Sequence, residues 1–343
     1  MLNIHTSREK VVAALKNETE MIPVIPLSTA HSATLSKIKM SALRREATLN
    51  VESQAQAWER YRYDGIFAYS DLSMIWENMG GRVKISEDGF PSQEIMLSRL
   101  EDADTLGFPD LKEKGNLKGA LEALKELDRR FGKDVAILIG TVGPFTMAGA
   151  MRGIDFFMMD IIKKPILAEN LLKRCRDFLI SYMNEVKRNG ALIVLVSDPM
   201  ASLISPSMFD KFTLPYEKDV FEKVRTDGMY SILHICGDAT AILSRMEESG
   251  SDCLWLDQKM NLKNARRTVG KMCLMGNVDP VSTLLRGTPQ DVKREAGRCI
   301  EAASKGGGFI LSAGCEIPMK TPPENLAALV ETARDYDLKQ RYA

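Results

Sequence analysis

The residues of this chain best suited to chemistry are His234, Cys236 and Cys315, in the segments SILHICGDAT and FILSAGCEIP. One imidazole and two thiolates are ligands typical of zinc, and three protein ligands leave a fourth position open, which distinguishes a catalytic zinc site from a closed structural one. Each segment is a short apolar run that ends in small residues. The alternative interpretation is a core histidine and two buried thiols, because free cysteine is often buried.

The elements that must position these ligands are indicated by eight short β-rich runs that alternate with helical stretches. The runs are apolar throughout, as expected of parallel strands covered on both faces. Eight strands, each followed by a helix, predict an α/β fold, a (β/α)8 TIM barrel that forms a single domain over residues 1–343. The runs lie at residues 22–26, 65–71, 135–143, 191–198, 230–237, 253–258, 273–279 and 308–315.

Small excursions from the barrel are expected near residues 72–100 and 144–163. The first follows the second run and contains GGRVKISEDGFPS, which suggests a hairpin. The second follows the third run, and we expect it to form a lid-like insert.

The predicted barrel brings the three ligands together. His234 and Cys236 are two positions apart on the fifth run, so their side chains point the same way. Cys315 ends the eighth run, and the carboxyl ends of barrel strands meet at the face that carries active sites. The remaining thiols fall at the starts of runs or in helical stretches and are interpreted as structural: Cys175, Cys253, Cys273 and Cys299.

Carboxylates also end predicted strands, at Asp71, Asp198 and Asp257, and we expect them to line the same mouth as catalytic residues. One of them could complete the zinc coordination or orient His234. The alternative is that each caps the helix that follows it. Asp279 has a similar place, and Glu316 is a further candidate, although the neighbour of a ligand usually points away.

The composition restricts the class of partner. The chain has 46 basic and 46 acidic residues, and this balance argues against nucleic acid or an anionic membrane as the main partner. There is no apolar run long enough to span a membrane, and the first residues lack the apolar stretch of a signal peptide. We therefore expect a soluble, cytoplasmic protein with reduced thiols.

Several segments resemble the uroporphyrinogen decarboxylase superfamily: YSDLSMIWENMGG, GTVGPFTMAG, DPMASLISPSMFDKFTLPYEK, GNVDP and GTPQDV. Within it, HICG and SAGCEIPMKTPPENL resemble the zinc-dependent branch, which includes methyltransferases that act between a corrinoid protein and a thiol such as coenzyme M. The resemblance implies a zinc cofactor, methylcobalamin supplied as a substrate on a separate corrinoid protein, and a small thiol or methylated small molecule. The zinc would favour the thiolate, which attacks the methyl group.

The decarboxylase branch is a less suitable match. Its members carry an Arg-rich motif after the first strand, which the resemblance implies is needed to hold a polycarboxylate. Here no arginine occurs between Arg8 and Arg44, although Asp71 matches the decarboxylase Asp in YSDL. The corrinoid-binding signature D-x-H-x-x-G is also absent, so the corrinoid is expected on a partner.

Three alternatives remain open from the sequence. The first is a methyltransferase of the opposite direction, which loads a corrinoid protein from a methylated substrate. The second is a decarboxylase of a porphyrinogen-like substrate, and the third is a barrel that binds metal or a partner without catalysis.

Overall fold

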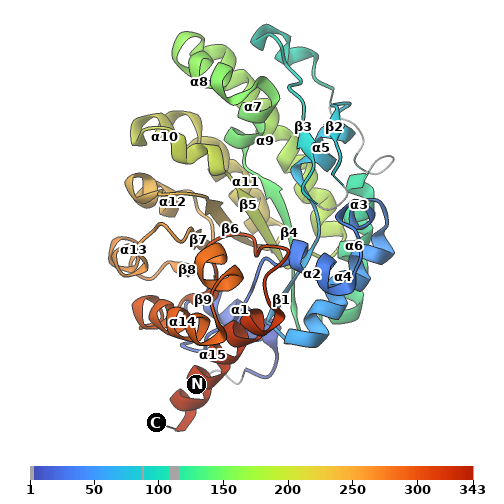
Figure 1. Cartoon of the computed structure of the whole chain (residues 1–343). Helices are drawn as coiled ribbons and strands as arrows, with labels where there is room; N and C mark the ends of the chain where they lie inside the picture. Colours follow the sequence, from blue (N-terminus) through green and yellow to red (C-terminus); the bar gives the residue numbers. More distant parts are fainter. Residues whose placement is uncertain (1–3, 87–88, 108–110, 112–115, 343) are drawn as a thin grey trace.

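The computed structural model describes residues 4–86, 89–107, 111 and 116–342. In this part of the chain, seven parallel strands form one curled sheet in the order β1-β4-β5-β6-β7-β8-β9, with helices outside it (Figure 1). The predicted TIM-barrel-like α/β fold is therefore confirmed. The strands are β1 (Gly65–Ala68), β4 (Ala136–Val142), β5 (Ile193–Ser197), β6 (Tyr230–Ile235), β7 (Cys253–Leu256), β8 (Cys273–Val278) and β9 (Phe309–Ala313).

The first predicted strand, residues 22–26, differs from the prediction because it forms only an isolated parallel bridge between Val24 and Leu311 of β9. The Leu311 amide donates to the Pro23 carbonyl at 2.8 Å, and the Asp64 amide, next to β1, donates to the Val24 carbonyl at 2.8 Å. Proline has no N–H, so the prolines at both ends of PVIP prevent a regular ladder. The segment still connects the two edges of the sheet.

Helices cover the outside of the sheet, and in Figure 1 α10, α12, α13 and α14 follow one another along one side. The sequence explains this placement, because α6 buries Leu117, Leu121 and Leu124 on one face at helical spacing. The outer helices are α4 (Ala47–Tyr61), α6 (Asn116–Phe131), α9 (Pro165–Arg188), α10 (Pro206–Phe212), α11 (Leu214–Thr226), α12 (Leu243–Glu248), α13 (Leu262–Val269), α14 (Pro289–Ala303) and α15 (Pro323–Tyr342).

The strands separate two apolar cores. Along β7, Cys253 and Trp255 belong to the cluster inside the barrel, whereas Leu254 and Leu256 pack with the outer helices. This alternation is the two-residue period of a strand. Helix α1 (Ser7–Leu15), which begins with the capping box of Thr6 and Glu9, adds three side chains to the inner cluster: Val11, Ala14 and Leu15.

The shorter elements lie mainly in the loops that follow strands. Residues 83–84 and 92–93 pair as an antiparallel ribbon, β2 (Val83–Lys84) with β3 (Ser92–Gln93), and residues 87–88 of this excursion lie outside the described residues. The segment 144–163 forms two helices, α7 (Pro144–Arg152) and α8 (Ile154–Lys163). The others are α2 (Thr29–Ser36), α3 (Met40–Arg45), α5 (Leu72–Asn78), η1 (Leu100–Thr105), η2 (Pro199–Leu203), η3 (Thr240–Ile242) and η4 (Pro280–Leu285).

Among the described helices, none combines the length and the apolar character that a membrane span requires.

We expect Asp64→Ala to destabilise the fold, because this carboxylate holds the segment of residues 22–26 beside β1. Its oxygens accept the Val24 amide at 2.7 Å and the Ser7 hydroxyl at 2.6 Å, and the side chain is nearly buried. The substitution leaves a buried amide without its acceptor, so the free energy of unfolding should fall by about 2–4 kcal/mol.

Denaturant unfolding measures this change, with Asp104→Ala as the control. The Asp104 side chain is 80% exposed, so its removal should change the free energy of unfolding by less than about 0.5 kcal/mol. If the two substitutions lowered the free energy of unfolding equally, Asp64 would not hold residues 22–26 in place.

Candidate metal centre and the adjoining cavity

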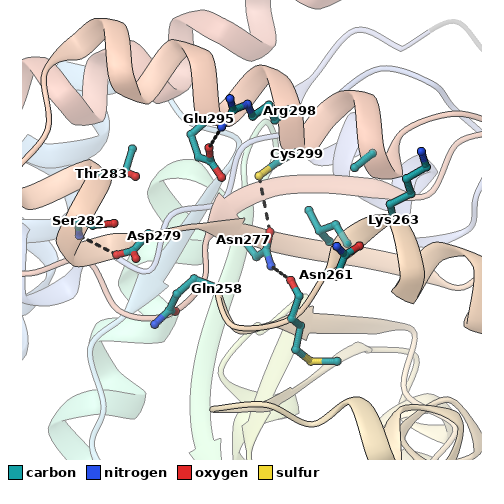
Figure 2. A pocket seen from close by; sticks show the side chains of 13 residues that line it. Gln258, Asn261, Lys263, Asn277, Asp279, Ser282, Thr283, Glu295, Arg298 and Cys299 are labelled. Carbon is teal, nitrogen blue, oxygen red and sulfur yellow. Dashed lines mark hydrogen bonds and ion pairs between the residues drawn. The ribbon is translucent and has the colours of Figure 1, made fainter.

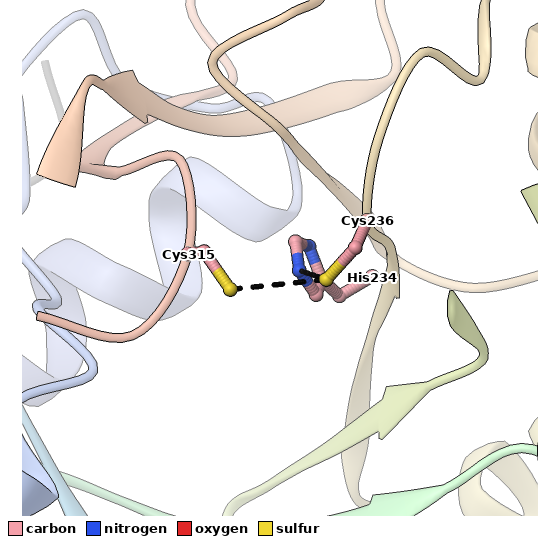
Figure 3. A group of neighbouring side chains, drawn as sticks. All are labelled: His234, Cys236 and Cys315. Carbon is pink, nitrogen blue, oxygen red and sulfur yellow. Dashed lines mark hydrogen bonds between the residues drawn. The ribbon is translucent and has the colours of Figure 1, made fainter. Parts of the chain in front are cut away.

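His234, Cys236 and Cys315 meet at the mouth of the barrel, where their ligand atoms all lie within 4.8 Å of one another. Figure 3 shows the three side chains pointing toward one another from two separate segments. The histidine Nε2 lies 2.9 Å from the Cys236 Sγ, and the two Sγ atoms are 3.7 Å apart. Three ligand atoms of these types, directed at one point, form a group that can hold a metal ion.

The strand β6 positions the first two members of this group. Ile232 points into the barrel, so His234 and Cys236 follow on the same side at two-residue spacing. The His234 Nδ1 lies 2.9 Å from the Trp255 carbonyl oxygen, which can only accept, so Nδ1 carries the hydrogen. The lone pair of the neutral ring is then on Nε2, which faces the thiols.

The two thiols influence each other strongly. The contact with Cys236 and the nearby His234 lower the pKa of Cys315 to about 4. The same contact, together with burial, raises the pKa of Cys236. The pair therefore loses one proton readily and shares the second, which is the behaviour expected of two close groups that cannot both ionise without a cation.

Asp257 holds the loop that carries Cys236. One carboxylate oxygen accepts the Gly237 amide at 2.8 Å, and the other accepts the Lys259 amide at 2.8 Å. Gly237 has φ +90°, a conformation that favours glycine, so the turn immediately after the ligand is fixed by both residues. Asp257 thus lies beside the thiols as a positioning group.

Asp198 is fully buried and binds the start of α7. Its two oxygens accept the Phe145 amide at 3.2 Å and the Thr146 amide at 2.6 Å. A Cβ atom at Gly143 would lie 2.2 Å from the Asp198 carboxylate, so glycine is required for this close approach. Burial raises the pKa of Asp198 to about 6, and the hydrogen bonds to Thr146 and Phe145 act in the opposite direction.

Glu217 of α11 is a second buried acid near Asp198. Its side chain has no exposure, and neither carboxyl oxygen has a hydrogen-bond partner among the described residues. Burial, followed by the charge of Asp198, raises the pKa of Glu217 well above its ordinary value. An unpaired carboxyl in such surroundings is stable only when it is protonated.

A cavity of about 250 Å³ adjoins the metal group on the side of β1, β4 and β5. Its residue Ser197 pairs in register with His234, and its residue Glu316 directly follows Cys315. Most of its wall is apolar. The apolar lining residues are Leu27, Phe67, Ala68, Leu72, Ile75, Phe90, Leu117, Val142 and Leu195.

Asp71 lines this cavity and is held by several donors. It caps α5 through the Met74 amide, accepts the Tyr69 hydroxyl at 2.8 Å, and lies 3.4 Å from the Arg44 Nε. Arg44 is itself buried and also pairs with Glu77 at 2.7 Å. Asp71 is therefore both a helix cap and a fixed negative group at the cavity wall.

Glu316, next to Cys315, is the further candidate that the sequence offered. It lines the cavity, and one of its oxygens accepts both the Thr29 hydroxyl and the Ala30 amide at 2.9 Å. Burial raises the pKa of Glu316 to about 8, whereas these hydrogen bonds act to lower it. The sequence gives little indication of where this side chain points, because the regular alternation of side-chain directions stops where the strand ends.

A second hollow, of about 440 Å³, lies on the outer side of β8 between α13 and α14 (Figure 2). Asn277 donates there to the carbonyls of Asp257 and Met260, and its amide oxygen faces the Cys299 thiol. Asp279 lines this hollow and caps η4. None of the three residues of the metal group lines either hollow, but two residues next to the group, Ser197 beside His234 and Glu316 beside Cys315, line the cavity of about 250 Å³ and not this one.

The predicted residues thus separate into two groups. The three predicted metal ligands lie together, and Asp257 and Asp71 lie beside them or along the adjoining cavity. Asp198 instead faces the backbone of α7. A catalytic role for these three aspartates stays a prediction.

The sequence profile of uroporphyrinogen decarboxylase (URO-D) matches residues 6–336, and the chain therefore belongs to this family. It is 29% identical over 342 residues to the methylcobamide:CoM methyltransferase MtbA of Methanosarcina mazei, covering 97% of this chain and 98% of the relative. It is 30% identical over 341 residues to MtaA of Methanosarcina barkeri strain Fusaro, with coverages of 96% and 98%. The uroporphyrinogen decarboxylase of Nostoc punctiforme is 29% identical over 296 residues, with coverages of 83% and 82%.

A solved structure supports the same grouping. The structure of a methyltransferase from Methanosarcina mazei superposes with a TM-score of 0.90 at 27% identity, covering 99% of this chain and 100% of that one. The similarity to methyltransferases extends over the whole chain, and we conclude that the chain is an enzyme, a methyltransferase of this family.

We expect Glu217→Met to stabilise the protein at pH 8 by about 1–3 kcal/mol, because it replaces an unpaired buried acid by an apolar side chain of similar length. The pKa of Glu217 is raised in the folded state, so the native protein keeps a proton that the unfolded chain loses above about pH 4.5. Native stability therefore falls as the pH rises above this value, and the gain from the substitution should be smaller at pH 5.

Urea unfolding at both pH values measures the effect. Glu222→Met is the control on the same helix, because the Glu222 side chain is 55% exposed. If Glu217→Met and the unmodified protein lose stability in parallel between pH 5 and pH 8, Glu217 does not carry the proton.

Proposed function

We propose that this methyltransferase uses zinc, bound by His234, Cys236 and Cys315, to move a methyl group between a corrinoid on a separate protein and a small thiol. The observation that carries the proposal is the convergence of these three ligand atoms at the barrel mouth, beside a cavity large enough for a small molecule. The similarity to methylcobamide:CoM methyltransferases supports the same reaction class.

The donor types fit zinc, and so does the spacing of the two sulfurs. Tetrahedral zinc with bonds of about 2.3 Å to sulfur separates two thiolates by about 3.8 Å, and the Cys236 and Cys315 sulfurs are 3.7 Å apart. In a neutral His234 ring the lone pair lies on Nε2, because Nδ1 donates to the Trp255 carbonyl. Such an outer hydrogen bond orients a histidine ligand.

Zinc held there would act as a Lewis acid that favours the thiolate form of a substrate thiol at neutral pH. The other contributions come from the chain itself. Asp257 fixes the turn after Cys236, and the apolar cavity wall excludes water from the substrate. Metal ligands held in fixed positions and a cavity that excludes water align the reacting atoms before the reaction. This alignment lowers the entropic cost of the transfer.

The methyl transfer forms a carbon–sulfur bond and breaks a cobalt–carbon bond. The electron pair of the broken bond stays on cobalt as Co(I), and the proton of the thiol passes to solvent. The corrinoid carrier would approach the carboxyl ends of the strands, because the proposed ligands Cys236 and Cys315 directly follow the ends of β6 and β9.

The first test concerns the metal. The unmodified protein should bind one zinc per chain, and Cys315→Ser should weaken zinc binding by more than about 100-fold, since loss of an outer partner alone costs up to that factor. Metal analysis after dialysis and competition with a chromophoric chelator measures both quantities. Cys299→Ser is the matched control, because Cys299 is a buried thiol outside the group.

Full zinc retention in single substitutions of all three ligands would exclude the assignment.

The second test concerns the reaction. Under anaerobic conditions, zinc-loaded protein should consume methylcobalamin in the presence of a suitable small thiol, with Co(I) followed by its absorbance. Chelation of the metal or Cys236→Ala should lower the rate by at least about 100-fold, and zinc should restore the chelated protein. Cys299→Ser should retain the rate of the unmodified protein.

The outcomes separate the remaining alternatives. If no thiol supports turnover while a methylated substrate loads a Co(I) corrinoid protein, the reaction runs in the opposite direction. Decarboxylation of a porphyrinogen without metal would overturn the proposal.

A further inference from the structure

Helix α8 has an apolar face that is open to solvent. The helix packs against α7 and α9 at the outer edge of the molecule (Figure 1). Its inner side is buried, whereas Phe156, Met159 and Ile162 on the other side are 55%, 49% and 70% exposed. Exposed apolar side chains that gather on one face, with polar residues around them, mark an interaction surface.

A side chain from another segment enlarges this face. Ile95 follows β3 and is 54% exposed. A Cβ atom built at Gly153 would lie 2.7 Å from the Ile95 side chain and 3.3 Å from the Phe156 ring, so these two side chains lie on the same side of the start of α8. The α8 patch therefore consists of four residues: Ile95, Phe156, Met159 and Ile162.

Two charged residues flank the patch. Asp155 lies in the first turn of α8 and Lys163 in the last, and both are exposed. Neither forms an ion pair with another described residue, whereas the buried acid of this helix, Asp160, pairs with Arg152 at 2.7 Å. An acid and a base are thus available at opposite ends of the apolar face.

The exposed residues of α8 are arranged symmetrically about Met159. Asp155 precedes Met159 by four residues and Lys163 follows it by four, while Phe156 and Ile162 lie three residues to either side. At 3.6 residues per turn, these five positions fall within an arc of about 120° with Met159 at its centre. One face of the helix therefore presents an acid, apolar side chains and a base, in that order.

Such a face is complementary to a second copy of itself. When two copies of α8 pack antiparallel about Met159, Asp155 of each copy lies opposite Lys163 of the other, and Phe156 lies opposite Ile162. A twofold interface requires this kind of match, in which one surface fits its own copy. The antiparallel arrangement also places the positive end of each helix dipole beside the negative end of the other.

The match favours a second copy of the chain over a different protein, because binding to a different protein does not require a surface to complement itself. The interface is also small. Helix α8 has ten residues and spans about 15 Å, whereas a standard interface buries about 800 Å² on each partner. The segment of Ile95 is needed to extend the contact, and the association is expected to be weak.

We infer that the α8 patch joins two copies of this chain in a twofold-symmetric dimer, with a dissociation constant of about 1–100 µM. The inference concerns assembly and does not rest on the proposed function.

Sedimentation velocity of the full-length protein between about 1 and 300 µM measures the equilibrium between monomer and dimer. The unmodified protein should change from monomer to dimer over this range. Ile162→Ser should weaken the dimer by at least about 10-fold, because each dimer loses two apolar side chains from its interface. Val281→Ser is the matched control, since Val281 is 42% exposed but follows β8, on the other side of the sheet from β4 and α8.

Exchange of charges tests the antiparallel match. Lys163→Asp places two acids opposite each other at both ends of the interface, and Asp155→Lys places two bases there, so each should weaken the dimer by about 10-fold. The double variant Asp155→Lys/Lys163→Asp brings opposite charges together again and should recover most of the affinity. Thermal unfolding followed by circular dichroism verifies that the variants are folded, and the substituted side chains are all exposed.

Each outcome decides a different point. A protein that stays monomeric up to about 300 µM overturns the inference and assigns the patch to a different protein, such as the corrinoid carrier. A dimer that Ile162→Ser leaves unchanged forms through another surface and also overturns it. If the double variant associates as weakly as the single variants, the antiparallel match is wrong. No metal or thiol enters these measurements, so the proposed function is tested separately.

Discussion

The closing of the sheet on itself is the constraint on which the metal group depends. Its ligands come from β6 and from the end of β9, and β7 and β8 lie between these strands in the sheet. The sulfurs of Cys236 and Cys315 are nevertheless only 3.7 Å apart. Only strong curvature brings non-neighbouring strands this close, and tilted barrel strands provide it.

The irregular segment at residues 22–26 maintains that curvature. Its backbone binds Leu311 of β9 on one side and Asp64, next to β1, on the other. The Ile317 amide, just after Cys315, donates to the Leu27 carbonyl at 2.8 Å and continues the same connection toward the mouth. A few hydrogen bonds of a proline-containing segment thus hold the second thiol in place.

Carboxylate side chains hold the loops around the barrel mouth by accepting hydrogen bonds from backbone amides. Asp198 binds the first turn of α7, Asp257 binds the turn after Cys236, and Asp71 binds the first turn of α5. Backbone amides at helix starts are favourable partners for carboxylates. Loops held in this way keep their shape when a substrate binds, so little binding energy is lost in ordering them.

The sequence was sufficient to predict the features that depend on local pattern. Eight apolar runs and the two-residue spacing of His234 and Cys236 predicted the barrel and the common direction of the two side chains. The sequence did not show that the prolines of residues 22–26 reduce the first strand to one bridge. Strand propensity alone does not account for the backbone N–H groups that the two prolines lack.

Features that depend on tertiary contacts were harder to predict. Asp198 and Asp257 have equivalent places after their strands, and yet one binds a helix start and the other a loop next to Cys236. Glu316 was expected to point away from the metal ligands, and its contacts with Thr29 and Ala30 place its side chain along a cavity that none of those ligands lines. Those contacts join residues far apart in the sequence, so spacing carries no signal for them.

The cavity also distinguishes between the two activities named within the family. A porphyrinogen with several carboxylates needs cationic donors, for which the guanidinium fork of arginine is best suited. Here the arginine that contacts the cavity acid Asp71 is buried and paired, and the described lining has acids, hydroxyls and apolar groups but no basic side chain. One barrel therefore serves different chemistry through the groups placed at its mouth. A thiol pair that could hold a metal, near a largely apolar cavity, suits activation of a small sulfur compound better than recognition of a polyanion.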